Sequence, residues 1–340
     1  MIFLPVSPES LQQAAQILRS GGLVAFPTET VYGLGADAFN AEAIAKIFEV
    51  KNRPRFDPLI IHIAALDTLE KVADMSLLSE ETRRKLFSLA ENFWPGPLSI
   101  VLPKNEKIPG IATAGLTTAA IRFPAHEAAR TLISLAGGAV AAPSANPFGS
   151  LSPTRAEHVR DKLGDKIDMI LDGGPAQIGV ESTVLDITGK SIKILRHGGA
   201  PKEEIEKLIG GVEENISNAN ASGALASPGQ LKSHYSPQKP LSVFSREEML
   251  RLPYEADAAY LFFDGSTREA WLEGRPEAGG QDSAVFRTLS EKGLVLEASA
   301  RLFEILHELE KCRISRIFAQ FAPFEGLGAA INDRLSRASI

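Results

Sequence analysis

The 340-residue sequence predicts an α/β or α+β protein of two domains joined by a linker. Three observations predict this organisation: helical and strand-like apolar patterns alternate over residues 1–210, the periodicity is lost over 211–240, and it resumes over 241–340. Apolar residues make up 44% of the chain, which is enough to bury a core, so a wholly disordered chain is excluded. We expect a twisted, mixed, open sheet in the first domain and a small Rossmann-like or flavodoxin-like domain at the end.

Capping residues and apolar spacing predict the element boundaries of the first domain. Ser7 can cap a helix that begins at Pro8, because proline suits the first helical position. A glycine pair at 21–22 ends this helix, a buried strand follows at 23–26, and Asn40 can cap a second helix. Further strands are expected at 59–63, 98–102, 119–123, 139–142, 168–172, 183–187 and 192–196, and further helices at 78–92, 126–136, 153–163 and 201–209.

The segment between the domains, residues 211–240, changes in composition at about residue 227. Residues 211–226 are mainly small or polar without periodicity, which is typical of a linker. In 227–237, Lys232, His234 and Tyr235 lie close together, so this stretch either packs on a domain surface or closes over a ligand. The C-terminal domain then alternates again, with strands expected at 241–244, 258–263 and 315–319 and helices at 246–251, 294–310 and 328–338.

Charge and cysteine content exclude several classes of protein. The net charge is −6, and the last hundred residues carry 12 basic and 16 acidic side chains, so neither domain has the basic excess typical of nonspecific nucleic-acid binding. A single cysteine, Cys312, excludes an intramolecular disulfide and a multi-cysteine metal site. No apolar run approaches the roughly 18–20 residues of a membrane helix, and the N-terminus lacks a signal-peptide pattern. These features predict a cytoplasmic protein that does not act at a membrane.

The common nucleotide and metal motifs do not occur in the sequence. The Gly-Lys-Ser at 189–191 lacks the earlier glycine of a P-loop, because Val184 stands in its place. The Gly-Leu-Gly at 326–328 opens a helix but lacks the third glycine of a dinucleotide site. The acidic residues and histidines show no metalloenzyme spacing, so we expect no metal site built from side chains.

Polar residues gather instead where strands and helices are expected to end. Residues 27–35 follow a buried strand and offer hydroxyls and glycines to a ligand. Residues 51–55 put three cations at a helix end, where they either balance the helix dipole or clamp a phosphate. Arg122 interrupts an apolar strand and needs an anionic partner. His62, taken alone, fits a hydrogen-bonded core histidine.

Further hydroxyls and amides follow other strands. Residues 142–147 end one strand, 181–183 start another, and 196–198 end a third. Residues 152–154, Ser-Pro-Thr, are expected to start a helix, and a helix N-terminus beside hydroxyls suits phosphate. Jointly these segments describe a pocket for a nucleotide and a carboxylate without a P-loop.

Taken in order, the segments resemble the L-threonylcarbamoyladenylate synthase family, in its long form with a YrdC-like domain and an extra C-terminal domain. The resemblance covers nearly the whole chain, and as a set its motifs are highly specific. The matching motifs are PTETVYGL at 27–34, KNRP at 51–54, PL at 58–59, FWPGPL at 93–98, IRFP at 121–124, APSAN at 142–146, SPT at 152–154, STV at 182–184, LRHG at 195–198, SHYSP at 233–237 and GLGAAINDRL at 326–335.

The resemblance implies a nucleotidyltransferase that converts L-threonine, bicarbonate and ATP into threonylcarbamoyl-adenylate and pyrophosphate. The product would serve N6-threonylcarbamoyl modification of adenosine 37 in tRNAs that read ANN codons, so tRNA threonylcarbamoyl-transfer proteins would act downstream. ATP is then a substrate, and Mg²⁺ would accompany it, held mostly by the phosphate oxygens.

The resemblance also implies residue roles. Lys51 and Arg53 would belong to the basic catalytic cluster. L-Threonine would contact Thr30, His62, Arg122, the backbone of Ala142, and Ser182. ATP would contact Arg53, Asp57, Thr118, Ser144, Ser152, Arg196 and Tyr235. Relatives often carry Asn at position 57, and the negative charge of Asp57 could instead face Mg²⁺ or an arginine.

Two other classes of protein fit part of the sequence. A YrdC-like domain has a concave surface with basic residues, so the chain could be an RNA-binding module without adenylate synthesis, or could add a weak RNA contact to its main activity. Steep salt dependence of RNA binding without ATP turnover would favour the module. A carbamoyl-transfer enzyme of the hydrogenase-maturation type contains a similar domain, but the chain has no Cys-rich zinc-finger segment to support that interpretation.

Overall fold

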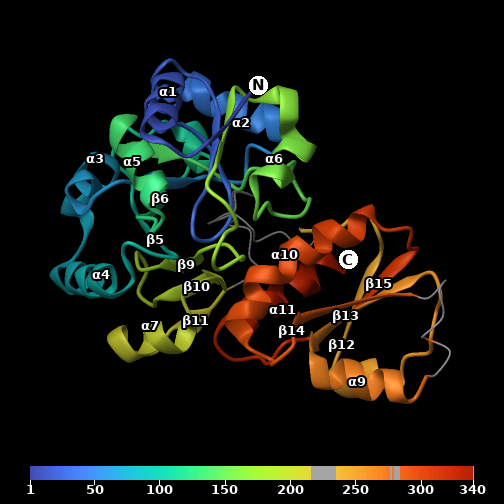
Figure 1. Cartoon of the computed structure of the whole chain (residues 1–340). Helices are drawn as coiled ribbons and strands as arrows, with labels where there is room; N and C mark the ends of the chain where they lie inside the picture. The colour runs from blue at the N-terminus through green and yellow to red at the C-terminus, as the bar shows by residue number, and fades with distance from the viewer. Residues whose placement is uncertain (216–234, 276–277, 279–283, 340) are drawn as a thin grey trace. The chain divides into compact units, whose positions relative to one another are not determined.

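The computed structural model describes residues 1–215, 235–275, 278 and 284–339, which form two compact units (Figure 1). The first unit consists of 1–148, 152–177 and the described residues from 181 to 215. The second unit consists of the described residues from 235 onwards and two short segments, 149–151 and 178–180. In the parts of the chain just given, no helix is long and apolar enough to span a bilayer.

A mixed sheet of eleven described strands runs through the first unit, which confirms the predicted α/β architecture. In spatial order the strands are β1 (Ile2–Pro5), β8 (Met169–Asp172), β2 (Val24–Phe26), β3 (Gly33–Asp37), β7 (Ala139–Ala141), β4 (Ile60–Ile63), β6 (Thr118–Arg122), β5 (Leu98–Pro103), β9 (Thr183–Asp186), β10 (Lys193–Arg196) and β11 (Glu213–Glu214). Neighbours pair both in parallel, as β4 with β6, and antiparallel, as β5 with β6.

Two α-helices of the first unit, α1 and α2, begin at caps that the sequence predicts. The Ser7 hydroxyl accepts the backbone N–H of Ser10 at 3.1 Å, and the Asn40 side chain accepts those of Glu42 and Ala43. Such caps satisfy N–H groups that have no partner within the helix. The described helices are α1 (Pro8–Arg19), α2 (Ala41–Lys51), α3 (Leu69–Val72), α4 (Glu80–Phe93), α5 (Glu127–Leu135), α6 (Ala156–Leu163) and α7 (Lys202–Ile209).

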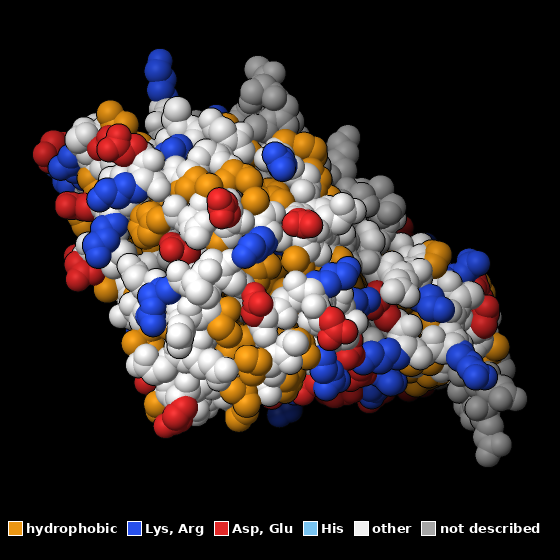
Figure 2. Space-filling model, turned by 90° about the horizontal axis from the view of Figure 1, so that it is seen from above, with side chains coloured by type: hydrophobic (Ala, Val, Ile, Leu, Met, Phe, Trp, Pro, Cys, Tyr) orange, Lys and Arg blue, Asp and Glu red, His pale blue; other side chains and the backbone are white. Residues whose placement is uncertain are grey.

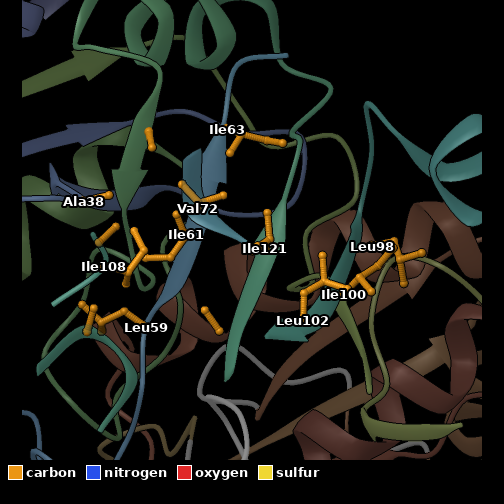
Figure 3. Packing of buried hydrophobic residues seen from close by; sticks show 14 of the residues in the cluster. Ala38, Leu59, Ile61, Ile63, Val72, Leu98, Ile100, Leu102, Ile108 and Ile121 are labelled. Atoms are coloured by element: carbon orange, nitrogen blue, oxygen red, sulfur yellow. The ribbon is translucent and has the colours of Figure 1, made fainter. Parts of the chain in front are cut away.

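The central strands β4, β6 and β5 separate the core from a polar face. Ile61, Ile121 and Ile100 point into the main hydrophobic core (Figure 3). Because successive side chains on a strand point to opposite faces, His62 and Arg122 lie on the other face. The strand register places these two residues side by side. This face is lined further by a small apolar cluster of Ile60, Val101, Ala120, Val184 and Leu195.

The second unit contains a four-stranded parallel sheet, which confirms the Rossmann-like prediction. Its strands, in spatial order, are β12 (Leu241–Phe244), β15 (Arg316–Gln320), β13 (Ala258–Asp264) and β14 (Val285–Ser290). Its described helices are α8 (Arg246–Arg251), α9 (Gly265–Glu273), α10 (Val295–Lys311) and α11 (Leu327–Ala338). An aromatic cluster centred on Tyr260 and Trp271, whose ring centroids lie 4.5 Å apart, forms the core on one face of the sheet.

Several elements were not predicted, among them β1, β3, β14 and α9. Strand β3 reads Gly-Leu-Gly-Ala-Asp, a composition of weak strand propensity, and the sequence interpretation treated part of it as a ligand-binding turn. The glycine at position 35 is required by packing, because a Cβ there would lie 2.9 Å from both the Phe26 ring and a Val140 methyl. Close packing rather than propensity therefore decides this strand.

The prediction that Ser152-Pro153-Thr154 starts a helix is wrong. Helix α6 begins at Ala156, with Arg155 at its N-cap position. The Pro153 carbonyl accepts the Tyr32 N–H at 2.8 Å, and the Thr154 carbonyl accepts the Ala176 N–H at 2.9 Å. These bonds to other segments hold 152–154 outside the helix, so Ser152 is placed by tertiary contacts and not by a helix N-terminus.

Candidate active site

Twelve of the thirteen predicted site residues belong to the first unit. They lie on strands of the large sheet or on the segments that follow its strands and α2, and most of their side chains are buried. These residues are Thr30, Lys51, Arg53, Asp57, His62, Thr118, Arg122, Ala142, Ser144, Ser152, Ser182 and Arg196. The thirteenth, Tyr235, belongs to the second unit.

Lys51 is the last residue of α2, and its side chain is buried. Its ammonium donates to the backbone carbonyls of Ser144, at 2.6 Å, and Asn146, both in the segment after β7. Burial, reinforced by the charge of Arg53, holds the pKa of Lys51 well below its usual range, although Asp57 and Glu181 oppose this shift. A buried amine that joins two segments is not a solvated charge on a helix end, so the dipole interpretation does not fit Lys51.

Arg53 and Asp57 form a buried pair one turn beyond α2. Asn52, in the left-handed conformation with φ of 52°, ends the helix and turns the chain. The Arg53 guanidinium donates to the carbonyls of Asp57, at 3.0 Å, and Pro58, at 2.8 Å, and lies 2.8 Å from the Asp57 carboxylate. Burial raises the pKa of Asp57, against the opposing charges of Arg53, Lys51 and Arg196. Asp57 thus faces an arginine, one of the two alternatives that the sequence left open.

Arg122 ends β6 beside a carboxylate that the sequence interpretation did not assign. Its Nε donates to the Gly96 carbonyl at 3.2 Å, and its Nη2 donates to Glu29 Oε1 at 2.6 Å. Burial raises the pKa of Glu29, but the Arg122 charge and hydrogen bonding outweigh it, and the net pKa lies below the usual value. The signal was present in the sequence: Glu29 is the one charged residue of 27–35.

His62 lies on β4 between Arg122 of β6 and Val140 of β7. Burial, together with the nearby Arg122 charge, lowers its pKa to about 3, so the imidazole is neutral at physiological pH. Its ring meets the Phe26 ring edge-on at 6.3 Å. Its Nδ1 has no hydrogen-bond partner among the residues that the structure describes, so this buried histidine has one nitrogen unused.

Hydroxyls and a third arginine extend the polar face to β9 and β10. Arg196 donates through Nη2 to the Ser182 carbonyl at 2.9 Å and to the Ser182 hydroxyl at 3.1 Å. The Ser182 hydroxyl also lies 2.8 Å from the Ser99 hydroxyl on β5. The Ser152 hydroxyl donates to the Glu181 carboxylate, which the sequence interpretation likewise did not assign. Through Ser182, these bonds connect Arg196 to Ser99 of β5, which is paired with Arg122 of β6.

The remaining predicted residues occupy opposite ends of the polar face. The Thr30 hydroxyl lies 2.8 Å from that of Thr28, and the Ala142 N–H donates to the Ile60 carbonyl at 2.9 Å. Thr118 begins β6 and Arg122 ends it. At roughly 3.3 Å per residue, the two lie about 13 Å apart. Thr118 and Arg122 therefore mark two positions along one strand of the polar face.

The described residues include no group of three or more His, Cys, Asp or Glu arranged to hold a metal ion. The arginines and Lys51 instead offer positive charge, and the serines and threonines offer hydroxyl donors. In a water-poor site such groups bind anionic ligands strongly. The fold and these groups define an α/β domain with buried cations on one face of its sheet, followed by a Rossmann-like domain.

Comparison with known proteins identifies the family. Residues 16–198 match the family model of Sua5, YciO and YrdC proteins, described as telomere recombination, and residues 200–339 match the C-terminal domain of threonylcarbamoyl-AMP synthase. The threonylcarbamoyl-AMP synthase of Pyrococcus abyssi is 42% identical over 96% of this chain and 93% of its own length. That of Bacillus subtilis is 38% identical over 99% and 94%. The chain belongs to the threonylcarbamoyl-AMP synthase family.

A solved structure agrees with this assignment. The crystal structure of P. abyssi Sua5 complexed with L-threonine is similar to this chain with a TM-score of 0.85 and 37% identity, covering 100% of this chain and 97% of that one. The long two-domain form predicted from the sequence motifs is thereby confirmed.

Proposed function

We propose that the chain is a nucleotidyltransferase that makes threonylcarbamoyl-AMP and pyrophosphate from L-threonine, bicarbonate and ATP. The observation that carries the proposal is its relatedness to threonylcarbamoyl-AMP synthases over nearly its full length. The cluster of buried cations in the first unit suits the phosphates of ATP and the carboxylate of threonine. The product serves N6-threonylcarbamoyladenosine formation in tRNA, so tRNA threonylcarbamoyl-transfer proteins are the expected partners downstream. We place the reaction in the cytoplasm, as the sequence predicts.

In this proposal, L-threonine binds at the Arg122 end of β6. The Arg122 fork receives the threonine carboxylate, because a guanidinium and a carboxylate match in charge and shape. His62, neutral and with Nδ1 unpartnered among the described residues, is placed to bond the threonine hydroxyl. Thr30, Ser182 and the Ala142 backbone complete the pocket.

ATP binds, in the same proposal, at the remaining cations and hydroxyls of the same polar face. Arg53 and Arg196 hold its phosphates, and Lys51 with Arg53 stabilises the charge that grows on them during the reaction. Ser144, Ser152 and Thr118 supply further hydroxyl contacts. Asp57 acts by orienting Arg53, since its carboxylate lies against that guanidinium. Mg²⁺ binds through the phosphate oxygens of ATP, because the described residues offer no three-ligand cluster.

The chemistry needs no covalent enzyme intermediate. The threonine amine, after losing a proton, attacks the carbon of CO₂ or bicarbonate and gives a carbamate, with loss of water when bicarbonate is the source. A carbamate oxygen then attacks the α-phosphorus of ATP, and pyrophosphate leaves. The protein positions the reactants and stabilises developing negative charge. That role agrees with a site of buried cations without an activated nucleophile.

Tyr235 would contact ATP if residues 227–237 close over the site as a mobile lid. Residues 227–234 lie outside the described residues. Tyr235 itself is buried within the second unit, where its ring lies 5.7 Å from the Phe303 ring and the Arg334 guanidinium lies 5.0 Å from its centroid. A lid must exchange these contacts for ligand contacts, whereas a fixed strap keeps them.

Hydrogen exchange across 227–237 distinguishes the lid from the strap. We expect protection that appears only with ATP and threonine, together with a higher ATP KM in Tyr235→Ala. Strong protection in the ligand-free protein, with unchanged kcat and ATP KM in Tyr235→Ala, would establish the strap.

The RNA-binding alternative receives no support from the charge pattern. On the face shown in Figure 2, basic and acidic side chains are interspersed over the described surface, without a continuous basic patch. The proposed reaction is tested by incubating the chain with ATP, L-threonine and labelled bicarbonate and separating the products. A labelled adenylate that forms only with threonine is expected. RNA binding with steep salt dependence and no adenylate would instead establish the alternative.

A further inference from the structure

The buried pair of Glu29 and Arg122 is incompletely satisfied within the protein. Only 4% of Glu29 and 3% of Arg122 is exposed. Glu29 Oε1 accepts from Arg122 Nη2, but its other oxygen, Oε2, has no hydrogen-bond partner among the described residues. Arg122 uses Nε and Nη2 of its guanidinium in these two hydrogen bonds, so its Nη1 can donate to a ligand. A buried carboxylate oxygen without a donor is energetically costly, so such an atom calls for a ligand.

The surroundings of Glu29 offer little else to satisfy Oε2. The backbone amides of Glu29 and Ala125 favour its ionised form, but neither makes an aligned hydrogen bond to it. His126 is close enough to feel the Glu29 charge, and burial lowers the His126 pKa, but its buried Nδ1 makes no hydrogen bond to Glu29 or to any other described residue. The missing partner of Oε2 is therefore a positively charged or N–H donor group from outside the described chain.

This geometry fits one kind of ligand group. An α-amino acid carries an ammonium and a carboxylate on the same carbon, so a carboxylate on Arg122 brings the ammonium next to the neighbouring residue. We propose that Glu29 binds the α-ammonium of the substrate amino acid through Oε2 while Arg122 binds its carboxylate. The inference rests on the proposed function and deepens it, because it makes Glu29 the residue that selects amino acids over other hydroxy carboxylates.

Glu29 acts here as a binding and positioning residue and not as the base. Its carboxylate has a pKa below the usual value, whereas an α-ammonium has a pKa of about 8. Transfer of the ammonium proton to Glu29 would therefore be strongly uphill. Oε2 instead holds the nitrogen in place, first as ammonium and then, after carbamate formation, through its N–H. The paired carboxylate also offsets the Arg122 charge, so the site as a whole is neutral and suits a zwitterion.

The test compares L-threonine with 3-hydroxybutyrate, which keeps the carboxylate and hydroxyl and lacks the α-amino group. Calorimetry on the full chain should show that the wild-type protein binds threonine more tightly. In Glu29→Gln, threonine affinity should fall by about tenfold to a hundredfold. Binding of 3-hydroxybutyrate should be unchanged or tighter, because Arg122 loses its internal counter-charge. Glu29→Asp, which keeps the charge, should retain part of the preference for threonine.

Two controls separate this role from a structural one. ATP binding in each variant reports whether the first unit is folded. Glu181→Gln removes another buried carboxylate, which accepts from the Ser152 hydroxyl, and should leave the threonine preference intact.

Three results would overturn the inference. Equal wild-type affinity for threonine and 3-hydroxybutyrate would show that the protein makes no contact with the ammonium. An equal loss of affinity for both ligands in Glu29→Gln would mean that Glu29 only holds Arg122 in position. Absence of any wild-type threonine binding would instead reject the proposed function, and the inference with it.

Discussion

The two units differ in the side chains that they bury against their sheets. The first unit buries ionic residues beside its central strands, among them Glu29, Lys51 and Arg122. The second unit buries an aromatic cluster that includes Tyr260 and Trp271 against its parallel sheet. Burying an ion costs several kcal/mol unless partners compensate, whereas burying an aromatic ring is favourable by itself. The comparison places the larger electrostatic cost beside the central strands of the first unit, where the proposed function puts the substrates.

Incomplete pairing sharpens this contrast. Among the described residues, Glu29 Oε2 and His62 Nδ1 lack hydrogen-bond partners in the first unit, and both lie beside Arg122. In the second unit, Asp333 pairs with Arg334 and Arg337, at 2.5 and 2.9 Å, within one helix. The two unpartnered atoms beside Arg122 mark the place in the first unit where a ligand is expected.

The largest effect on stability is expected in the second unit. Trp271→Ala removes a fully buried ring that packs at a tilt against the rings of Tyr260 and Phe286. It should lower the free energy of unfolding by about 3–5 kcal/mol, as measured in urea. The threonine KM, measured well below the unfolding temperature, should not change. A raised threonine KM would show that the two units do not divide packing and binding as proposed.

The largest effect on turnover is expected for Lys51→Ala. If Lys51 stabilises charge that grows in the transition state, kcat should fall by about 10²–10³ while ATP binding weakens less. Lys46→Ala is the matched control, because Lys46 also lies on α2 and donates to a backbone carbonyl, that of Gly21. It should leave kcat unchanged. Unchanged kcat in Lys51→Ala, with about 1 kcal/mol lost from stability, would restore the helix-dipole interpretation.

Arg122→Ala should act on threonine and much less on ATP. A charge-assisted contact in a desolvated site is worth roughly 2–3 kcal/mol, so the threonine KM should rise about 30-fold or more. Arg275→Ala, in the second unit, removes an arginine that donates to the carbonyls of Leu250, Leu252 and Trp271, and should leave that KM unchanged. Equal threonine KM values in wild type and Arg122→Ala would remove Arg122 from the binding site.

A smaller effect concerns acid stability. The folded His62 has a pKa of about 3 against 6.5 unfolded, so between these values the unfolded chain binds a proton that the folded chain does not. His62 therefore adds stability above pH 6.5 that is lost as the pH falls toward 3, by at most about 1.4 kcal/mol per pH unit. In His62→Gln, urea unfolding between pH 4 and 7 should show a shallower decline. Parallel declines would mean that His62 is protonated in the folded chain.

Local rules predicted much of the fold. The caps at Ser7 and Asn40 were predicted because side-chain acceptors act over three residues. Strand β3 was missed because its glycines serve contacts with Phe26 and Val140, which are distant in sequence. The start of α6 was misplaced for the same reason, since Tyr32 and Ala176 hold the preceding segment. Long-range contacts override propensity at these places.

The site was predicted chiefly through its motifs. Those motifs identified Lys51, Arg53 and Arg122 as candidate site residues. The local sequence does not show which charged side chains form ion pairs with one another. The pairing of Arg122 with Glu29 joins residues 93 positions apart and depends on the strand order of the sheet. The orphaned Nδ1 of His62 could not be anticipated either, because it depends on packing between β4, β6 and β7.

The central claim is that the buried cations serve threonylcarbamoyl-AMP synthesis. Its most direct test is the stoichiometry of the two products. Wild-type protein is incubated with ATP, L-threonine and labelled bicarbonate, and pyrophosphate and labelled adenylate are quantified together. Pyrophosphate should appear only when both threonine and bicarbonate are present, with equimolar labelled adenylate, and both should fall together in Lys51→Ala. Pyrophosphate released without threonine, or full synthesis by Lys51→Ala, would contradict the assignment.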